Sequence, residues 1–246
     1  MDKKFEREYF ELDSQDKHWW LAVRRKIIKD LLSSNFSQPS STKILDFGSS
    51  SGEFVRYLQK LNYDVSGCDV SEEAVIKGQQ KGIVNLTVLK DNCLDFPSNS
   101  FGVVLALDVL EHVEYERSAI EEIHRVLKEN GLFIIFVPAF KFLWGIQDEI
   151  SHHYRRYTVH SLLAMVQKSA HFEVIKKSYF NTFLFLPIAL IRLLSKILNI
   201  NRESDLEINN HFLNYLFFHI FNFERKLLRY LSFPFGVSVL LVLKKK

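Results

Sequence analysis

The chain has 246 residues, of which 47% are hydrophobic and 25% charged, so it can bury a full core and is neither disordered nor fibrous. The net charge of +3 is unevenly divided: residues 1–140 carry 17 Lys and Arg against 22 Asp and Glu, and residues 141–246 carry 15 against 7. The basic half favours an anionic partner, such as a phosphorylated substrate or a membrane surface, and a solvated basic surface is the alternative. We expect no nucleic-acid partner.

The two cysteines, Cys68 and Cys93, give neither a disulfide framework nor the spacing of a metal site. The first residues, "MDKKFEREYF", are charged throughout and lack the apolar run of a secretory signal. We therefore predict a cytoplasmic protein, with peripheral contact at the inner membrane surface as an open alternative, and no metal ion.

Residues 5–32 are predicted to be helical, because Trp20, Val23, Ile27 and Leu31 recur at spacings of three and four. The segment "SSNFSQPSST" then breaks the pattern with Ser, Asn and Pro. We interpret residues 1–42 as an N-terminal docking helix followed by a linker.

From residue 43, short apolar runs alternate with amphipathic segments. The runs are "KILDF", "YDVSGCD", "LTVLKD", "GVVLALD" and "LFIIFVPA", and helices are predicted over 53–61, 71–81 and 114–129. Gly131 is predicted to cap the third of these helices. Parallel strands need crossover connections, so the alternation predicts a doubly wound α/β fold with helices on both faces of the sheet. A helix over 158–170 and the alternating strand "HFEVIKKSYF" complete a predicted core of residues 43–180.

Residues 181–232 form a predicted helical insert, before a final core strand, "GVSVLLVL", and a basic tail in 233–246. The uncharged stretches 178–191 and 208–223 are shorter than the roughly 18–20 apolar residues of a membrane span. The helix around "HFLNYLFFHIFNFERKLLRYL" is apolar nearly all round, so it must pack on protein, in a homodimer, or in the interfacial layer of a membrane. These three alternatives stay open.

The segment "DFGSSSG" joins the first strand of the core to its first helix. Gly48 and Gly52 let the chain turn tightly and expose backbone N–H groups at the start of the helix. A dinucleotide site would need G-x-G-x-x-G, but Ser50 stands where the middle glycine often lies, and no Gly-Lys-Ser/Thr of a P-loop follows. A nicotinamide-dependent dehydrogenase is therefore disfavoured.

Asp69 ends the second strand, 21 positions after Gly48. An acidic residue at that place accepts hydrogen bonds from the two hydroxyl groups of a ribose. The alternative is a turn residue that caps the helix after Ser71.

The motifs "LDFGSSSG", "GCDVS", "DNCLDFPSNSF", "ALDVLEHV" and "VLKENGLFIIFVPA" together resemble the class I S-adenosylmethionine-dependent methyltransferases of the type 11 group. The resemblance implies a seven-stranded Rossmann-like sheet and S-adenosyl-L-methionine as cofactor. It implies that the methionine part of the cofactor contacts Asp46, Gly48, Ser50 and Gly52, and that the ribose contacts Asp69 and Val70. It also implies that the adenine contacts Asp91, Asn92 and Cys93, and that Asp108 lies on the floor of the site below the sulfonium. The chain departs from the family pattern at Ser50 and at Gly102, where an Asp is usual.

Methyl transfer from a sulfonium needs alignment more than catalytic groups, but a hydroxyl acceptor must lose a proton. His112 is the first candidate for the base, and shaping the pocket is its alternative role. The segment "SHHYRRYT" adds His152 and Tyr154 as catalytic candidates, with Arg155 or Arg156 available to hold an anion.

Two further pairs, on the N-terminal helix, have mainly structural interpretations. Trp19 and Trp20 are expected to pack, and Arg24 and Arg25 to extend to the surface.

We predict a methyltransferase acting on a small or lipid-linked acceptor, with oxygen preferred. The alternative is an inactive module of the same fold that binds lipid or a protein through the insert.

Overall fold

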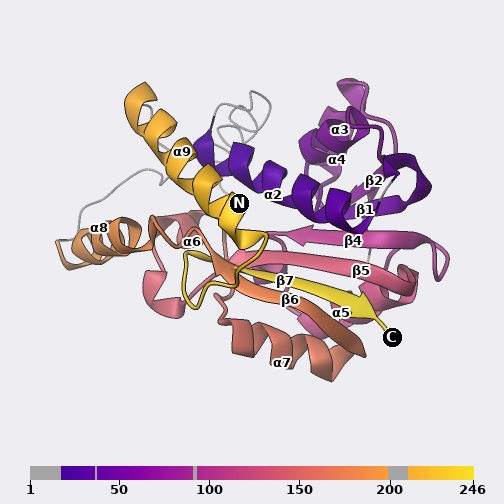
Figure 1. Ribbon diagram of the computed structural model, residues 1–246. Helices are drawn as coiled ribbons and strands as arrows, with labels where there is room; N and C mark the ends of the chain where they lie inside the picture. The colour runs from indigo at the N-terminus through magenta and orange to yellow at the C-terminus, as the bar shows by residue number, and fades with distance from the viewer. Residues whose placement is uncertain (1–17, 37, 91–92, 199–209) are drawn as a thin grey trace.

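The computed structural model describes residues 18–36, 38–90, 93–198 and 210–246. Within them, seven strands form one sheet of order β3-β2-β1-β4-β5-β7-β6 (Figure 1). Strands β1 to β5 pair in parallel, and β7 lies antiparallel between β5 and β6. The strands are β1 (Lys43–Phe47), β2 (Asp64–Asp69), β3 (Leu86–Val88), β4 (Phe101–Leu107), β5 (Leu127–Pro138), β6 (Phe172–Phe180) and β7 (Ser238–Lys245). The predicted doubly wound α/β fold is confirmed.

Helices cover both faces of the sheet because successive strand side chains point to opposite faces. Phe133, Ile135 and Val137 of β5 pack into one apolar cluster, and Ile134 and Phe136 pack into the other. The first cluster is completed by α5 (Glu116–Val126) and α7 (Val159–Ser169). The second is completed by α2 (Trp19–Asn35), α3 (Glu53–Gln59), α4 (Glu72–Gln80) and α9 (His211–Leu228).

Two predicted helix starts are confirmed by their capping hydrogen bonds. The Ser71 hydroxyl accepts from the Ala74 N–H at 3.2 Å, and the Thr158 hydroxyl accepts from the Ser161 N–H at 3.0 Å. The predicted cap at Gly131 is wrong, because α5 already ends at Val126 and Gly131 lies inside β5.

Residues 128–131 bulge out of the pairing between β4 and β5. Phe101 pairs with Leu127, whereas Val103, two residues on, pairs with Leu132. A Cβ atom on Gly131 would lie 2.8 Å from the Lys128 carbonyl oxygen, so the bulge itself needs this glycine.

The N-terminal helix docks on the insert as well as on the sheet. The Trp19 ring meets Phe217 and Phe221 edge to face at centroid distances of 5.5 and 5.8 Å. The Trp19 backbone N–H donates to Asn214 Oδ1 at 2.9 Å, and Asp30 forms an ion pair with Arg225. Figure 1 shows α2 and α9 together above the sheet. The packing role expected of Trp19 is confirmed, while the division of the chain into four segments stays a prediction.

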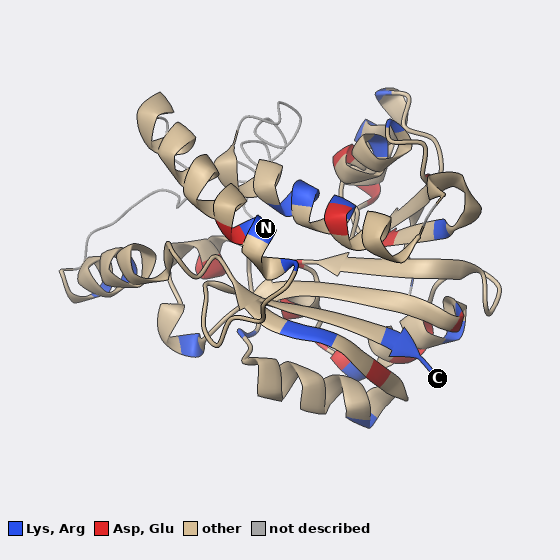
Figure 2. Cartoon of the chain, in the orientation of Figure 1, with Lys and Arg blue, Asp and Glu red and all other residues tan. Residues whose placement is uncertain are grey.

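The insert helices α8 (Phe185–Ile197) and α9 expose large apolar side chains. Leu186 is 73% and Ile197 74% exposed on α8, and Phe212 is 70% exposed on α9. Figure 2 shows α9 uncharged along most of its length, with its charged residues near the C-terminal end. In the described part of the chain, no helix combines the length and the apolar character needed to cross a bilayer.

Candidate active site

The turn between β1 and α3 brings three residues with left-handed backbone to the carboxyl edge of the sheet. Their φ values are +78° at Gly48, +50° at Ser50 and +77° at Gly52. A Cβ atom on Gly48 would lie 2.3 Å from Val109 Cγ2, so only glycine fits there. Ser50 adopts a conformation that glycine adopts without strain, which is a physical reason for glycine to be usual at this position.

Asp69 ties this turn to the end of β2. Its carboxylate accepts from the Ser50 N–H at 2.7 Å and from the Ser71 N–H at 2.9 Å. Burial raises the pKa of Asp69, while hydrogen bonds from the Ser71, Ser50 and Val70 backbone oppose that rise. The turn-residue interpretation therefore holds, and the ribose contact stays a prediction for the remaining lone pairs of the carboxylate.

A pocket opens between this turn, the end of β4 and helix α2. Its lining comprises Leu21, Arg24, Arg25, Ile28, Asp46, Gly48, Ser49, Ser50, Phe54, Leu107, Asp108 and Phe136. The lining thus brings together four residues that were predicted to contact the methionine part of the cofactor or to form the floor of its site: Asp46, Gly48, Ser50 and Asp108. A pocket at the carboxyl edge of a doubly wound sheet is the usual ligand site of such folds.

The expectation that Arg24 and Arg25 extend to the surface is wrong. They are only 6% and 8% exposed. Arg24 forms an ion pair with Asp108, and its guanidinium lies 3.9 Å from the centre of the Trp20 ring. The sequence pattern gave no signal for these two pocket residues, because neither belongs to the apolar stripe of Trp20, Val23, Ile27 and Leu31.

Neither Val70 nor Cys93, which were also predicted to bind the cofactor, belongs to the lining of this pocket. Val70 is 68% exposed, and Cys93 is exposed with its Sγ 3.8 Å from Glu122 Oε2. Asp91 and Asn92 lie outside the described residues. The departure at Gly102 lies near the start of β4, where a Cβ atom would meet Thr42, at the opposite end of the strand from the pocket-lining Leu107.

His112 ends a 3₁₀ turn (Leu110–His112) that follows β4. Its ring meets the His153 ring at a centroid distance of 4.5 Å, in an edge-to-face arrangement. Burial lowers the pKa of His112 to about 4, and the neighbouring His153 acts in the same direction. His152 and Tyr154, the other catalytic candidates, are exposed. The structure therefore pairs His112 with His153, which was not among those candidates.

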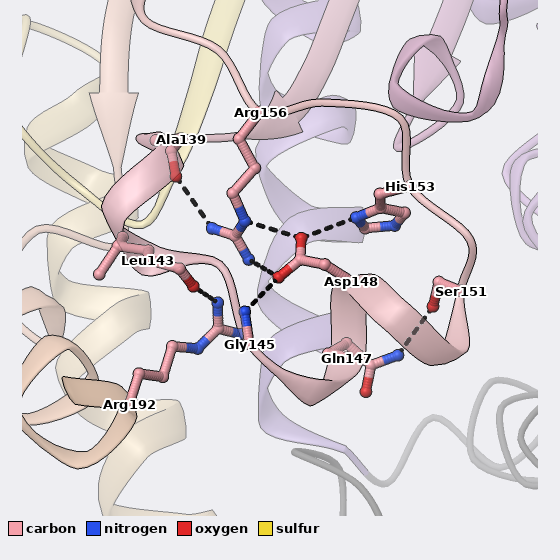
Figure 3. Close-up of polar contacts among 9 residues, drawn as sticks. All are labelled: Ala139, Leu143, Gly145, Gln147, Asp148, Ser151, His153, Arg156 and Arg192. Carbon is pink, nitrogen blue, oxygen red and sulfur yellow. Dashed lines mark hydrogen bonds and ion pairs between the residues drawn. The ribbon is translucent and has the colours of Figure 1, made fainter. Parts of the chain in front are cut away.

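Arg155 or Arg156 was predicted to be available to hold an anion, but the Arg156 guanidinium is already bound within the protein. Its Nε donates to Asp148 Oδ1 at 2.7 Å, its Nη2 to Asp148 Oδ2 at 3.0 Å and its Nη1 to the Ala139 carbonyl oxygen at 2.9 Å (Figure 3). Arg155 forms an ion pair with Glu116. Both side chains already have carboxylate partners, so neither is a ready anion holder.

Glu111 precedes His112 and is completely buried. Neither of its carboxylate oxygens is hydrogen-bonded to another residue of the described chain. Burial, together with the charge of Asp108, raises the pKa of Glu111 well above its usual value. An unpartnered buried carboxylate is costly, so its surroundings need an explanation.

Residues 45–135 match the family model described as a methyltransferase domain. The chain is 30% identical over 104 residues to a ubiquinone biosynthesis O-methyltransferase of Glaesserella parasuis, covering 38% of this chain and 44% of that protein. It is 31% identical over 108 residues to a sarcosine/dimethylglycine N-methyltransferase of Aphanothece halophytica, covering 41% and 39%. The matches thus span less than half the length of these two relatives.

Two solved structures share the fold across most of the chain. One, an S-adenosylmethionine-dependent methyltransferase from Thermotoga maritima, has a TM-score of 0.60 at 14% identity and covers 99% of this chain and 97% of its own. The other, the [4+2]-cyclase SpnF, has a TM-score of 0.58 at 17% identity and covers 92% and 81%. Because a cyclase has this architecture too, the fold alone does not fix the reaction.

Proposed function

We propose that this chain is an S-adenosylmethionine-dependent methyltransferase of the type 11 group, and that it methylates a small or lipid-linked acceptor, preferably at oxygen. The single observation that carries the proposal is the pocket at the carboxyl edge, lined by Asp46, Gly48, Ser50 and Asp108. When bound there, S-adenosylmethionine supplies an activated methyl group, which leaves alignment and exclusion of water to the protein.

The pocket carries charges that suit both ends of an amino acid. Asp46, which is 4% exposed, would face an ammonium group, and Arg24 and Arg25 of α2 would face a carboxylate, although Arg24 would first have to exchange its present partner, Asp108. Asp69, next to the turn, would bind the ribose together with Val70, and Asp91, Asn92 and Cys93 are proposed around the adenine. Helix α2 lies along the pocket, where it would keep water from the methyl group.

The acceptor class is supported by the insert. Helices α8 and α9 carry exposed leucine, isoleucine and phenylalanine side chains. An apolar surface of this kind suits an acceptor with a lipid tail, or contact with the membrane that holds it. The two relatives act, by name, at oxygen and at nitrogen, so the preference for oxygen is ours.

A hydroxyl acceptor would have to lose its proton near the acceptor edge of the pocket. His112, His152 and Tyr154 are the proposed groups there. Burial lowers the pKa of His112 to about 4, which makes its neutral ring a weak base, because general bases work best with a pKa near the operating pH.

A second candidate function is an inactive module that binds lipid or protein through the insert. The observation that favours it is the ion pair between Arg24 and Asp108, which joins two residues of the pocket lining. Such a module would bind vesicles or a protein without binding or turning over the methyl donor.

Calorimetry with S-adenosylhomocysteine separates these functions. We expect wild-type protein to bind one equivalent, and Asp69→Ala to weaken binding about 100-fold because it removes an acceptor for two hydroxyls and loosens the turn. Asp64→Ala, at the exposed opposite end of β2, is the matched control and should bind like wild type. A folded wild type that releases no binding heat would contradict the enzyme proposal.

The acceptor itself can be found with methyl-labelled donor. Label should pass into a lipid extract in the presence of wild-type protein and not with Asp69→Ala. Label that enters only a water-soluble extract would keep the methyltransferase and reject the lipid-linked acceptor.

A further inference from the structure

Glu111, His112 and His153 converge at the turn that follows β4. Among the residues that the structure describes, they form a group whose ligand atoms all lie within 4.8 Å of one another. They come from distant parts of the chain: Glu111 and His112 from the turn after β4, and His153 from the segment after α6 (Ile146–Ile150). The Tyr154 N–H donates to the Glu111 carbonyl oxygen at 2.8 Å, which fastens the two segments together.

One of the two histidines is already held by an outer partner. His153 Nδ1 lies 2.8 Å from Asp148 Oδ1, and Figure 3 shows Asp148 between the His153 ring and the Arg156 guanidinium. Histidines that bind metal ions are usually oriented in this way, through a carboxylate or a carbonyl at the other nitrogen.

Glu111 supplies the observation that points to a ligand. It has no exposed surface, and neither carboxylate oxygen is hydrogen-bonded to another described residue. One of its oxygens lies within 4.8 Å of one ring nitrogen of each histidine. A buried carboxylate without hydrogen bonds is expensive, and a cation between it and the two rings would offset that cost.

The three ligand atoms must draw together to enclose an ion. In the tetrahedral arrangement that zinc prefers, ligand atoms about 2.0–2.2 Å from the ion lie about 3.3–3.6 Å from one another. Ligand atoms that are separated by up to 4.8 Å would therefore approach by at most about 1.5 Å. Such a movement lies within the freedom of a side-chain rotamer.

We propose that Glu111, His112 and His153 form a binding site for a divalent first-row transition metal ion, with Zn²⁺ as the best-suited occupant. Two imidazoles and one carboxylate favour zinc, iron or cobalt over the oxygen-seeking Mg²⁺ and Ca²⁺. Three protein ligands leave a coordination position for water or an acceptor oxygen. The proposal opposes the sequence-based expectation of no metal, and it stands whether or not the chain transfers methyl groups.

His112 has a different role under this proposal. Histidine binds a metal ion through an unprotonated ring nitrogen, and a nitrogen bound to the ion cannot also accept a proton. His112 would then be a ligand, and deprotonation of a hydroxyl acceptor would not depend on its ring.

Cobalt(II) titration of chelator-treated full-length protein tests the site directly, because bound Co²⁺ absorbs in the visible range. We expect one Co²⁺ per chain, displaced by Zn²⁺ and not by a large excess of Mg²⁺. His153→Gln should weaken cobalt binding at least about tenfold, since it removes one of three ligands. His152→Gln is the matched control: it changes the neighbouring exposed histidine and should bind cobalt like wild type.

Glu111→Gln should also weaken cobalt binding, since it replaces the third ligand. Folding of every variant is checked by thermal melting, and His153→Gln carries the test if Glu111→Gln does not fold. The proposal is overturned if folded wild type binds no Co²⁺ at stoichiometric concentration, or if Mg²⁺ displaces it. It is equally overturned if His153→Gln binds as tightly as wild type, or if His152→Gln loses as much affinity as His153→Gln. None of these readings depends on activity, so failure here leaves the proposed methyltransferase untouched.

Discussion

The pocket side and the insert side of the molecule are built from different parts of the polypeptide. At the pocket, the turn between β1 and α3 depends on backbone conformation, with glycines at positions where a Cβ atom would collide. At the insert, α9 is held through side chains: the Trp19 ring meets Phe217 and Phe221, and Glu224 accepts from the backbone that follows β6. Substitutions in the turn should therefore destabilise the protein through steric clashes, and substitutions in the insert should destabilise it by removing interaction partners.

Gly48→Ala should have the largest effect. It places a Cβ atom 2.3 Å from Val109 Cγ2 at a φ of +78°, which combines a clash with a left-handed conformation. We expect the free energy of unfolding to fall by about 2–4 kcal/mol, measured by urea denaturation.

Gly82→Ala is the matched control for Gly48→Ala. Gly82 has the same φ of +78°, but nothing lies within 4 Å of its added Cβ atom. It should cost only about 1 kcal/mol, the conformational part alone. Equal losses in the two variants would show that collision with Val109 does not define the turn.

Glu224→Ala comes next and tests how the insert is attached. This carboxylate, 1% exposed on α9, accepts from the Thr182 N–H at 2.7 Å, the Phe183 N–H at 2.9 Å and the Asn181 N–H. Removing it leaves three donors without that acceptor, so the free energy of unfolding should fall by about 2–3 kcal/mol.

Glu121→Ala gives the comparison for Glu224→Ala. Glu121 makes an exposed ion pair with Arg117 on α5, and its removal should change the free energy of unfolding by less than about 0.5 kcal/mol. A Glu224→Ala variant as stable as Glu121→Ala would mean that α9 is fixed by apolar packing alone.

The sequence predicted the pocket side better than the insert side, because strand and turn patterns are local. The apolar runs that end at Asp69 and at the Gly48 turn are short and buried, so the local pattern identifies them as strands. Asp69 and the Gly48 turn both lie at the carboxyl edge of the sheet, where these two strands end. The bulge around Gly131 was missed because a glycine after a helix and a glycine in a bulge look alike in sequence.

Long-range polar contacts could not be predicted from local pattern. Nothing near His112 indicates that His153 will meet its ring, and nothing near Arg156 indicates that Asp148 will occupy its guanidinium. Arg24 was missed for a related reason, since an arginine on a helix is ordinarily solvated and its burial follows from where α2 docks.

Leu186→Glu tests the exposed face of the insert. Leu186 is 73% exposed on α8, and its loss from a bilayer interface should cost about 1.5 kcal/mol, or roughly tenfold in vesicle affinity. Sedimentation with anionic vesicles measures this. Val84→Glu, at a site 64% exposed between α4 and β3, should bind vesicles like wild type. Equal binding by both variants, or a wild type that dimerises and ignores vesicles, would contradict membrane contact.

Ser50→Gly should have the smallest effect, and it asks whether the turn tolerates its departure from the family pattern. Relief of the left-handed φ of +50° is partly offset by the greater freedom of glycine in the unfolded chain, so stability should rise by less than about 1 kcal/mol. Asn62→Gly, at a φ of +64° away from the pocket lining, should gain less because asparagine tolerates this conformation. The backbone N–H of residue 50 still donates to Asp69 when the residue is glycine, so the affinity of Ser50→Gly for S-adenosylhomocysteine should stay within about twofold of wild type. A large loss would mean that the Ser50 hydroxyl itself holds the cofactor, and the turn would then depend on a side chain as the insert does.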